Sequence, residues 1–185
     1  MNDDTLRARL RRETTAEHER LDAEASRLNL AQRGDFATFI AMQEAAFASL
    51  LRGRATGHFV TRDMLKMFRD ACLSDLAHLG RDPAPAPEVA SDSAPEAVDH
   101  IILGSRLGTA VLRPIWQVSD DPVVSGANAY FSLPLMQTIW RQHCDALSSR
   151  PVCGNLSDKI LDDTRQLFTL FSAALSNAGQ VFTNG

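Results

Sequence analysis

The sequence predicts an all-α protein. Apolar residues recur at three- and four-residue steps through most of the chain, which is the period of an amphipathic helix. No stretch shows the strict apolar–polar alternation of a β-strand, and no segment repeats. The 185 residues match the size of one ordinary domain. We therefore expect a single-domain helical bundle with about six main helices.

The composition is that of a soluble globular protein, with 44 % hydrophobic and 23 % charged residues. A formal net charge of −4 argues against general nucleic-acid binding, although basic residues gather in "LRARLRRE" near the start. The first residues lack the apolar core of a signal peptide, and no apolar run has the length of a membrane span. The three cysteines form no close metal-type pair, and Cys72 and Cys144 have the apolar neighbours of core thiols. We expect a cytoplasmic protein that binds neither nucleic acid nor membrane.

Three helices are predicted in the first 80 residues. The stripe of the first helix comprises Leu6, Leu10, Thr14, His18, Leu21, Ala25 and Leu28. A second helix opens at Gly34 and ends near Gly53 or Gly57. The third begins at Thr61, a favourable N-cap, and ends at Gly80, which suits the position after the last turn.

A proline-rich stretch, "RDPAPAPEVASDSAPE", follows at residues 81–96. Because each flank is too short to bury an independent core, we interpret this stretch as a surface loop within one domain rather than a linker. The helices predicted after it span residues 100–118, 127–147 and 156–182, with breaks at "SDDP" and "SSRPVCGN".

His18 is the first candidate for chemistry because it lies in the apolar stripe of the first helix. One interpretation is a core histidine with a satisfied hydrogen bond. The other is a metal ligand, since neutral imidazole binds iron through one ring nitrogen. A ligand histidine usually donates its other N–H to an acceptor, and Asp22 lies four residues later on the same face. A His-x-x-x-Asp pair is common by chance, so both interpretations stay open.

The stretch "HIILGSRLGTAVL" has a helical pattern although it contains Gly104 and Gly108 on one face. Each glycine in a helix interior costs about 0.5–1 kcal/mol relative to alanine. Close packing of a second helix would explain the two glycines. A flat ligand against the backbone would explain them equally well, because any Cβ would then clash.

Together, His18 and the two glycines match the needs of a haem. A haem takes an axial imidazole on one side, a close apolar wall on the other, and cations at its propionate edge. Arg11 precedes His18 by seven residues, two turns away on the same side of the predicted helix. It is either a partner for a carboxylate through charge-assisted hydrogen bonds or an exposed arginine that aids solubility.

Two segments carry a resemblance to a known family. "LRRETTAEHERLDAE" (residues 10–24) resembles the proximal helix of haem oxygenases, and "GSRLG" (104–108) resembles the distal-helix motif of their bacterial branch. That branch includes the enzymes encoded beside bacteriophytochromes. Further matches follow in the family's order at "DLAHLG" (75–80), "AYFSLPL" (129–135), Trp140, Leu147 and Phe168. The resemblance covers nearly the whole chain and implies a helical bundle of the haem oxygenase type.

The resemblance also implies a role for each candidate residue. His18 would be the axial ligand of the haem iron, with Asp22 as the acceptor for its other ring nitrogen. Gly104, Ser105 and Gly108 would line the distal side, close to dioxygen. The remaining haem-binding residues would be Arg11, Arg141 and Phe168.

Two positions depart from the bacterial branch. The residue before the first glycine is often acidic there and is Leu103 here, and His100 stands where tyrosine is frequent. Neither position ligates iron, but both can alter the hydrogen bonds of the distal helix. They therefore bear on turnover more than on haem binding. We expect His100 to be structural or at the rim of the site rather than a distal ligand.

The implied activity is the oxidative opening of haem, which is both cofactor and substrate. Dioxygen and electrons from a reductase or ferredoxin would yield biliverdin, carbon monoxide and free iron, with a bacteriophytochrome as a candidate acceptor of the biliverdin. One alternative is a non-catalytic haem- or tetrapyrrole-binding or signalling protein on the same scaffold. A third possibility, an enzyme of the related thiaminase-like scaffold, predicts no haem spectrum.

Overall fold

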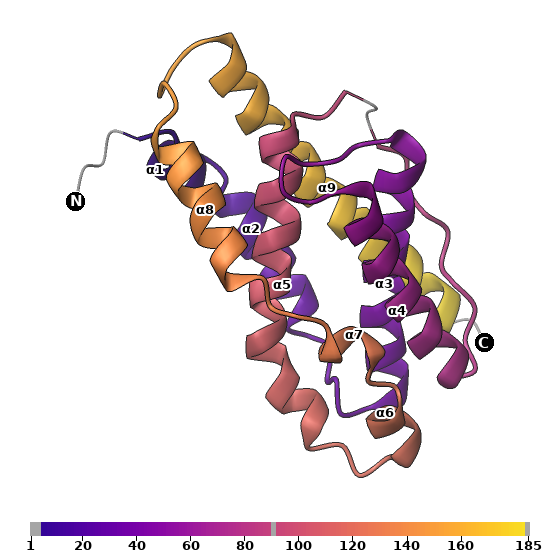
Figure 1. The fold of residues 1–185 in the computed structure, drawn as a ribbon. Helices are drawn as coiled ribbons and strands as arrows, with labels where there is room; N and C mark the ends of the chain where they lie inside the picture. Colours follow the sequence, from indigo (N-terminus) through magenta and orange to yellow (C-terminus); the bar gives the residue numbers. More distant parts are fainter. Residues whose placement is uncertain (1–4, 90–91, 184–185) are drawn as a thin grey trace.

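The computed structural model describes residues 5–89 and 92–183, and every regular element in them is an α-helix (Figure 1). The all-α prediction is confirmed for this part of the chain. The described residues form nine helices rather than about six, because two predicted helices are each interrupted once and a short helix, α6, was not predicted. They are α1 (Leu6–Glu13), α2 (Thr15–Ala25), α3 (Arg33–Gly53), α4 (Arg62–His78), α5 (Pro95–Gln117), α6 (Pro122–Gly126), α7 (Ala129–Ser132), α8 (Gln137–Ser148) and α9 (Asn155–Thr183). None of the described helices is both long and apolar enough to cross a bilayer.

Several helix ends follow the local chemistry predicted for them. The side-chain oxygen of Thr61 accepts a hydrogen bond from the Met64 amide at 3.2 Å, which caps α4. Gly80, just beyond α4, has a φ of +66°, in the left-handed region that glycine adopts at low cost. α3 ends at Gly53, and Arg54 after it takes the left-handed conformation.

The first predicted helix is one stripe in the sequence but two helices in the structure. Thr14 separates α1 from α2, with φ −113° and ψ 9°. Its hydroxyl donates to the Leu10 carbonyl at 2.9 Å, and Arg165 of α9 donates to the Glu13 carbonyl at 3.1 Å. Because Arg165 satisfies a carbonyl at the break, the chain can bend there at low cost. The prediction of one straight helix through residue 28 is wrong.

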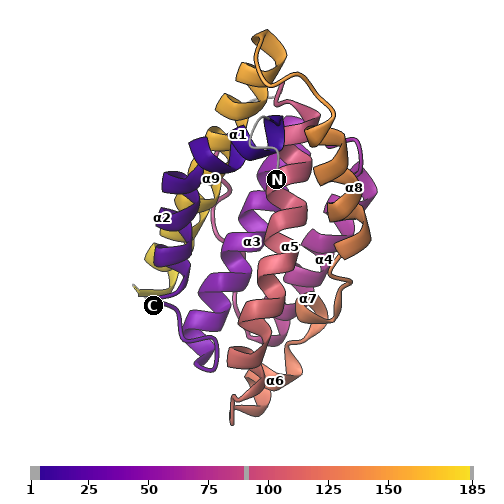
Figure 2. The same cartoon turned by 90° about the vertical axis from the view of Figure 1, so that its left-hand side faces the viewer.

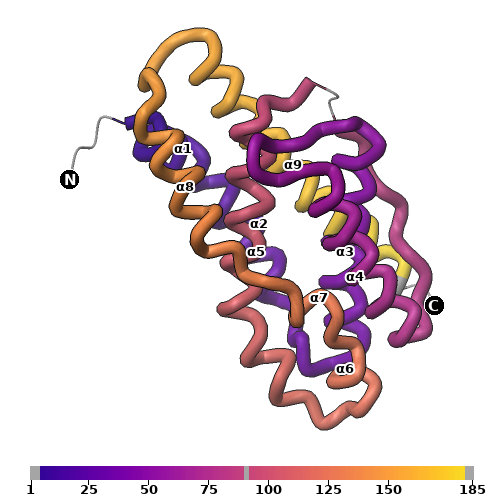
Figure 3. Tube along the Cα trace, viewed as in Figure 1, coloured from indigo at the N-terminus to yellow at the C-terminus, as the bar shows by residue number. Residues whose placement is uncertain are grey.

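α3 forms the centre of the bundle. It is buried on nearly every side, and it packs against α4 and α9, as the tube in Figure 3 shows. One hydrophobic cluster joins it to residues from both ends of the chain, including Leu6 of α1 and Ala178 of α9. Cys72 and Cys144 are buried, as predicted, and Cys153 is exposed.

The described residues of the proline-rich segment before α5, 81–89 and 92–94, form no helix, and α5 begins inside the expected loop at 81–96. α5 begins at Pro95, which suits the first helical turn because its missing N–H would be unpaired there anyway. Side chains of the bundle hold the segment in place: Ser49 of α3 donates to the Pro87 carbonyl, and Asn177 of α9 donates to the Pro85 carbonyl.

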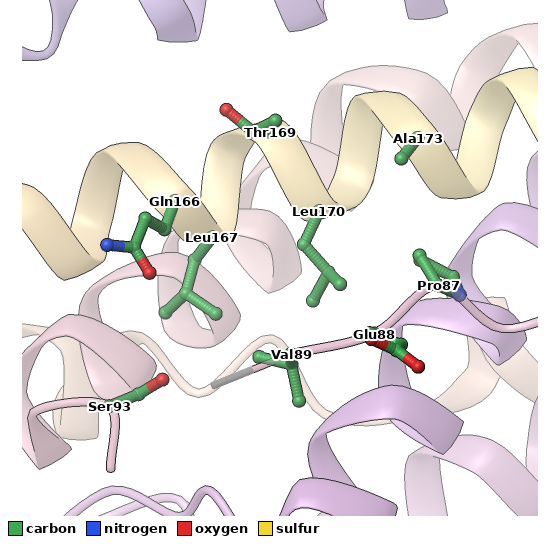
Figure 4. Close-up of a pocket in the computed structure, with 9 residues that line it drawn as sticks. All are labelled: Pro87, Glu88, Val89, Ser93, Gln166, Leu167, Thr169, Leu170 and Ala173. Carbon is green, nitrogen blue, oxygen red and sulfur yellow. The ribbon is translucent and has the colours of Figure 1, made fainter. Parts of the chain in front are cut away.

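A cavity of about 160 Å³ lies between the proline-rich segment and α9 (Figure 4). Leu167 and Leu170 of α9 face Val89 across it. It is smaller than the pockets of about 300–1,000 Å³ that enclose drug-sized ligands. Its described lining includes none of the predicted site residues.

The predicted helix over 127–147 is also interrupted. α7 ends at Ser132 and α8 begins at Gln137, because Pro134 lacks the N–H that would continue a helix. Arg106 of α5 donates to the carbonyls of Leu133 and Pro134 at 3.0 and 3.4 Å, which satisfies the broken backbone. The break lets α8 pack along α5, the helix that carries the two glycines.

Candidate functional site

His18 lies on α2, and 59 % of its side-chain surface is exposed. The core-histidine interpretation is therefore wrong. The physical reason is the position of α2, which lies at the rim of the bundle against α9 and contains no buried residue (Figure 2). A helix at the rim exposes positions of its apolar stripe that a helix at the centre of the bundle would bury.

Two neighbours orient the His18 ring. Its Nδ1 lies 3.3 Å from Oδ2 of Asp22, the partner that the spacing predicted. Its edge packs against Phe168 of α9, with 5.5 Å between ring centroids and an interplanar angle of 79°. Donation from Nδ1 to Asp22 would leave the Nε2 lone pair for a metal. The structure thus brings together three of the predicted residues.

The glycine face of α5 is open at Gly108. A Cβ at Gly108 would meet no atom of another described element within 4 Å, and one at Gly104 would meet the Trp140 ring at 3.7 Å, an ordinary contact. Close helix–helix packing therefore does not explain the glycines. The open face continues as apolar surface, because Val111 and Ile115 are 75 % and 40 % exposed.

The α2 histidine and the α5 face border a common region. His100 precedes Gly104 by one turn on the same face of α5. Burial, together with the smaller effects of the charges of His143, His18 and Arg7, lowers the pKa of His100 to about 3. His18 of α2 and Arg7 of α1 are thus the charged side chains of neighbouring helices that act on His100.

α8 supplies a wall of this region that sequence reasoning missed. The Trp140 ring lies 5.2 Å from the His100 ring, and a Cβ added at Gly104 would lie 3.7 Å from it. His143 is buried, and its Nε2 lies 3.3 Å from Nδ1 of His100. A signal was present in the sequence: His143 adjoins Cys144 on the apolar face of the helix pattern that became α8.

Leu103 and Arg106 lie on the buried side of α5. Leu103 is fully buried in the core, so this departure from the family pattern does not face the open region. Arg106 is also fully buried, and its guanidinium lies 4.6 Å from the centre of the Tyr130 ring. Ser105 is half-buried, and its carbonyl accepts a hydrogen bond from Thr109.

The predicted propionate partners lie on neighbouring helices. Arg11 of α1 and Arg141 of α8 are both exposed, and α1 packs against α8. Arg9, by contrast, is tied to Glu13. The bend at Thr14 lies between Arg11 and His18, so the prediction of a straight two-turn spacing between them is wrong.

The described residues contain no group of three or more histidine, cysteine or acidic side chains arranged to hold a metal ion. A haem requires less of the protein, because the porphyrin supplies four nitrogens and one imidazole completes the axial position. The residues present fit such a group. His18 is exposed and oriented by Asp22, and Gly108 and Val111 offer a bare, apolar helix face.

No protein-family model and no curated protein sequence matches this chain. The function must therefore be inferred from the site itself.

Proposed function

We propose that this protein binds haem between α2 and α5 and opens it oxidatively, as haem oxygenases do. One observation carries the proposal: the histidine is exposed, and two glycines leave the backbone of the α5 face uncovered. The Nδ1 of His18 is engaged by Asp22, and Gly104 and Gly108 leave the α5 backbone accessible. An imidazole ligand and a flat wall are what a haem needs.

Each residue would have a separate role in haem binding. His18 would bind the iron through Nε2, Asp22 would hold the proton on Nδ1, and Phe168 would keep the ring from rotating. The glycines would let porphyrin and dioxygen approach the α5 backbone. Arg7, Arg11 and Arg141 are exposed cations that would pair with the propionates.

A bound haem would supply the activation of dioxygen for the opening of its own ring. The balanced reaction converts one ferric haem, three dioxygen molecules, seven electrons and eight protons into products. The products are biliverdin, carbon monoxide, ferrous iron and three water molecules. The electrons come from a separate donor, a reductase or ferredoxin, and the protons must cross the protein. We place this reaction in the cytoplasm, with a bacteriophytochrome as a candidate acceptor of biliverdin.

A second candidate is a non-catalytic haem-binding or signalling protein. His100 favours it, because burial keeps this imidazole neutral and the neutral form is the one that ligates iron. If His18 and His100 both ligated the iron, no position would remain for dioxygen, and the bound haem would stay intact.

A haemin titration tests binding. The wild-type protein should give the Soret spectrum of a histidine-ligated haem, and His18→Ala should lose it. His78→Ala, which removes an exposed histidine of α4, is the matched control and should keep the spectrum. An unchanged spectrum in His18→Ala would assign the ligand elsewhere, first to His100. A wild-type protein without a Soret band would refute both haem candidates and favour a thiaminase-like enzyme.

Ascorbate or a reductase, added in air, then tests cleavage. The Soret band should bleach while a red-absorbing bilin band grows. A Soret band that persists under these conditions would refute cleavage and leave the binding protein.

A further inference from the structure

Two histidines on neighbouring helices share one hydrogen bond beside the proposed haem site. Nε2 of His143 on α8 lies 3.3 Å from Nδ1 of His100 on α5. His143 is 1 % exposed and packs edge-on against Phe59, with 6.4 Å between ring centroids. Trp140 packs against both imidazoles, at 5.2 Å from His100 and 5.8 Å from His143. Aromatic packing therefore fixes the geometry of the pair.

The inner end of the pair is His100. It lies one turn before Gly104 and keeps part of its surface exposed. The charges of His18 on α2 and Arg7 on α1 both act on its pKa. The hydrogen bond to His143 uses Nδ1 of His100, so Nε2 is the ring nitrogen left to exchange a proton.

The outer end of the pair is His143. The charge of Glu96 raises its pKa and that of His58 lowers it. Nε2 of His58 lies 3.1 Å from Oε1 of Glu96, and Glu96 also pairs with Arg150. The His58 side chain is 54 % exposed, so the His58–Glu96 pair itself reaches solvent.

The pair can pass a proton without holding a charge. Burial lowers the pKa of His100 to about 3 and that of His143 to about 4, so both rings are neutral at pH 7. When His143 donates to His100, His100 carries a proton on Nε2 and His143 has a lone pair on Nδ1.

The transfer balances at each nitrogen. Nε2 of His100 releases its proton to water or to a reacting oxygen beside Gly104. The shared proton moves from Nε2 of His143 to Nδ1 of His100, and Nδ1 of His143 takes a proton from the outer side. Both rings end neutral in the opposite tautomer, and exchange with water resets them.

We propose that His100 and His143 form a proton relay from the outer side of α8 to the Gly104 face of α5. The inference rests on the proposed function, because haem opening consumes the protons that such a relay delivers. His143 acts through His100 and is a positioning residue in this scheme.

Nitrogen-15 spectra of the haem-free protein test the pair directly. The two rings should be neutral from about pH 5 to 7, with a shared proton between Nδ1 of His100 and Nε2 of His143. Rings that titrate independently near 6.5, the ordinary histidine value, would overturn the relay.

Single turnover tests the function of the pair. His143→Phe fits beside Phe59 and Trp140, and His78→Phe is the control on α4. His143→Phe should keep the Soret spectrum, slow bilin formation at least about tenfold and raise its solvent deuterium isotope effect, since a positioned proton donor contributes about 10²–10⁴. His78→Phe should change neither. A wild-type rate and isotope effect in His143→Phe would show a structural role only.

These experiments distinguish an incorrect relay from an incorrect proposed function. A wild-type protein that binds no haem, or binds it without cleavage, refutes the function and the relay together. Wild-type cleavage that His143→Phe leaves unchanged refutes the relay alone. A six-coordinate wild-type spectrum that becomes five-coordinate in His100→Phe would instead make His100 an iron ligand.

Discussion

His18 and His143 both lie on amphipathic helices, yet the side chain of His18 is 59 % exposed and His143 is 1 % exposed. The difference comes from their helices, because α2 lies at the rim against α9 whereas α8 packs against α1 and α5. Sequence spacing predicted Asp22 as the partner of His18, since both residues lie on one helix. It did not predict the pairing of His143 with His100, because those residues meet only after two helices pack.

Stability should fall as the pH drops below the ordinary histidine pKa of about 6.5. Burial lowers the pKa of His143 to about 4, so the unfolded chain takes up this proton first. Above the ordinary histidine pKa, the stabilisation from neutral His143 is fully present. As the pH falls from that value to the pKa of about 4 in the folded protein, the free energy of unfolding drops by on the order of 3 kcal/mol. Urea unfolding of the wild type and His143→Phe across this range measures the effect. If the free energy of unfolding depended on pH in the same way in both proteins, this contribution of His143 would be contradicted.

At the scale of the helix, α5 shows how much of a helix can be predicted from its local sequence pattern. The stretch with Gly104 and Gly108 is one uninterrupted helix, as predicted. Its start at Pro95 was missed because the proline-rich stretch lacks helical periodicity. Pro114 lies inside the helix although proline normally disfavours that position. Packing against α8 and α9 outweighs these local costs, and a single stretch of sequence does not contain that information.

Replacements at Gly108 should separate the stability of α5 from its role in ligand binding. Because a Cβ there meets no other element, Gly108→Ala should stabilise the haem-free protein by about 0.5–1 kcal/mol. Gly108→Leu should fold as well but weaken haemin binding or change the meso carbon that is attacked. Gly179→Ala on α9, where a Cβ also meets nothing, is the control for stability alone. Wild-type haemin binding and products in Gly108→Leu would remove the close-approach argument.

At the scale of the whole molecule, the bundle depends on bonds between distant segments. Asp75 of α4 accepts hydrogen bonds from the amides of Ala129 and Tyr130, at 2.8 and 2.9 Å, and so fixes the start of α7. The helical class followed from periodicity, but the division into α7 and α8 did not. Asp75 and Ala129 are 54 residues apart, and no local pattern links them.

Asp75→Ala should therefore destabilise the fold. Two backbone amides would lose their acceptor, one of them buried, at about 1–3 kcal/mol for each unsatisfied group. Asp70→Ala, at an exposed position of the same helix, should stay within about 0.5 kcal/mol of the wild type. Thermal and urea unfolding of both variants provide the measurement. Equal stability of the two would show that Asp75 does not anchor α7.

The lack of buried residues in α2 also determines how often this helix opens. Its backbone amides should exchange with deuterium through local openings that cost far less than global unfolding, while those of α3 stay protected. Haemin held by His18 would tie α2 to the rest of the bundle and slow that exchange. Mass spectrometry of peptides from the two helices would follow it. Part of the ligand's binding free energy would then be used to close one rim helix.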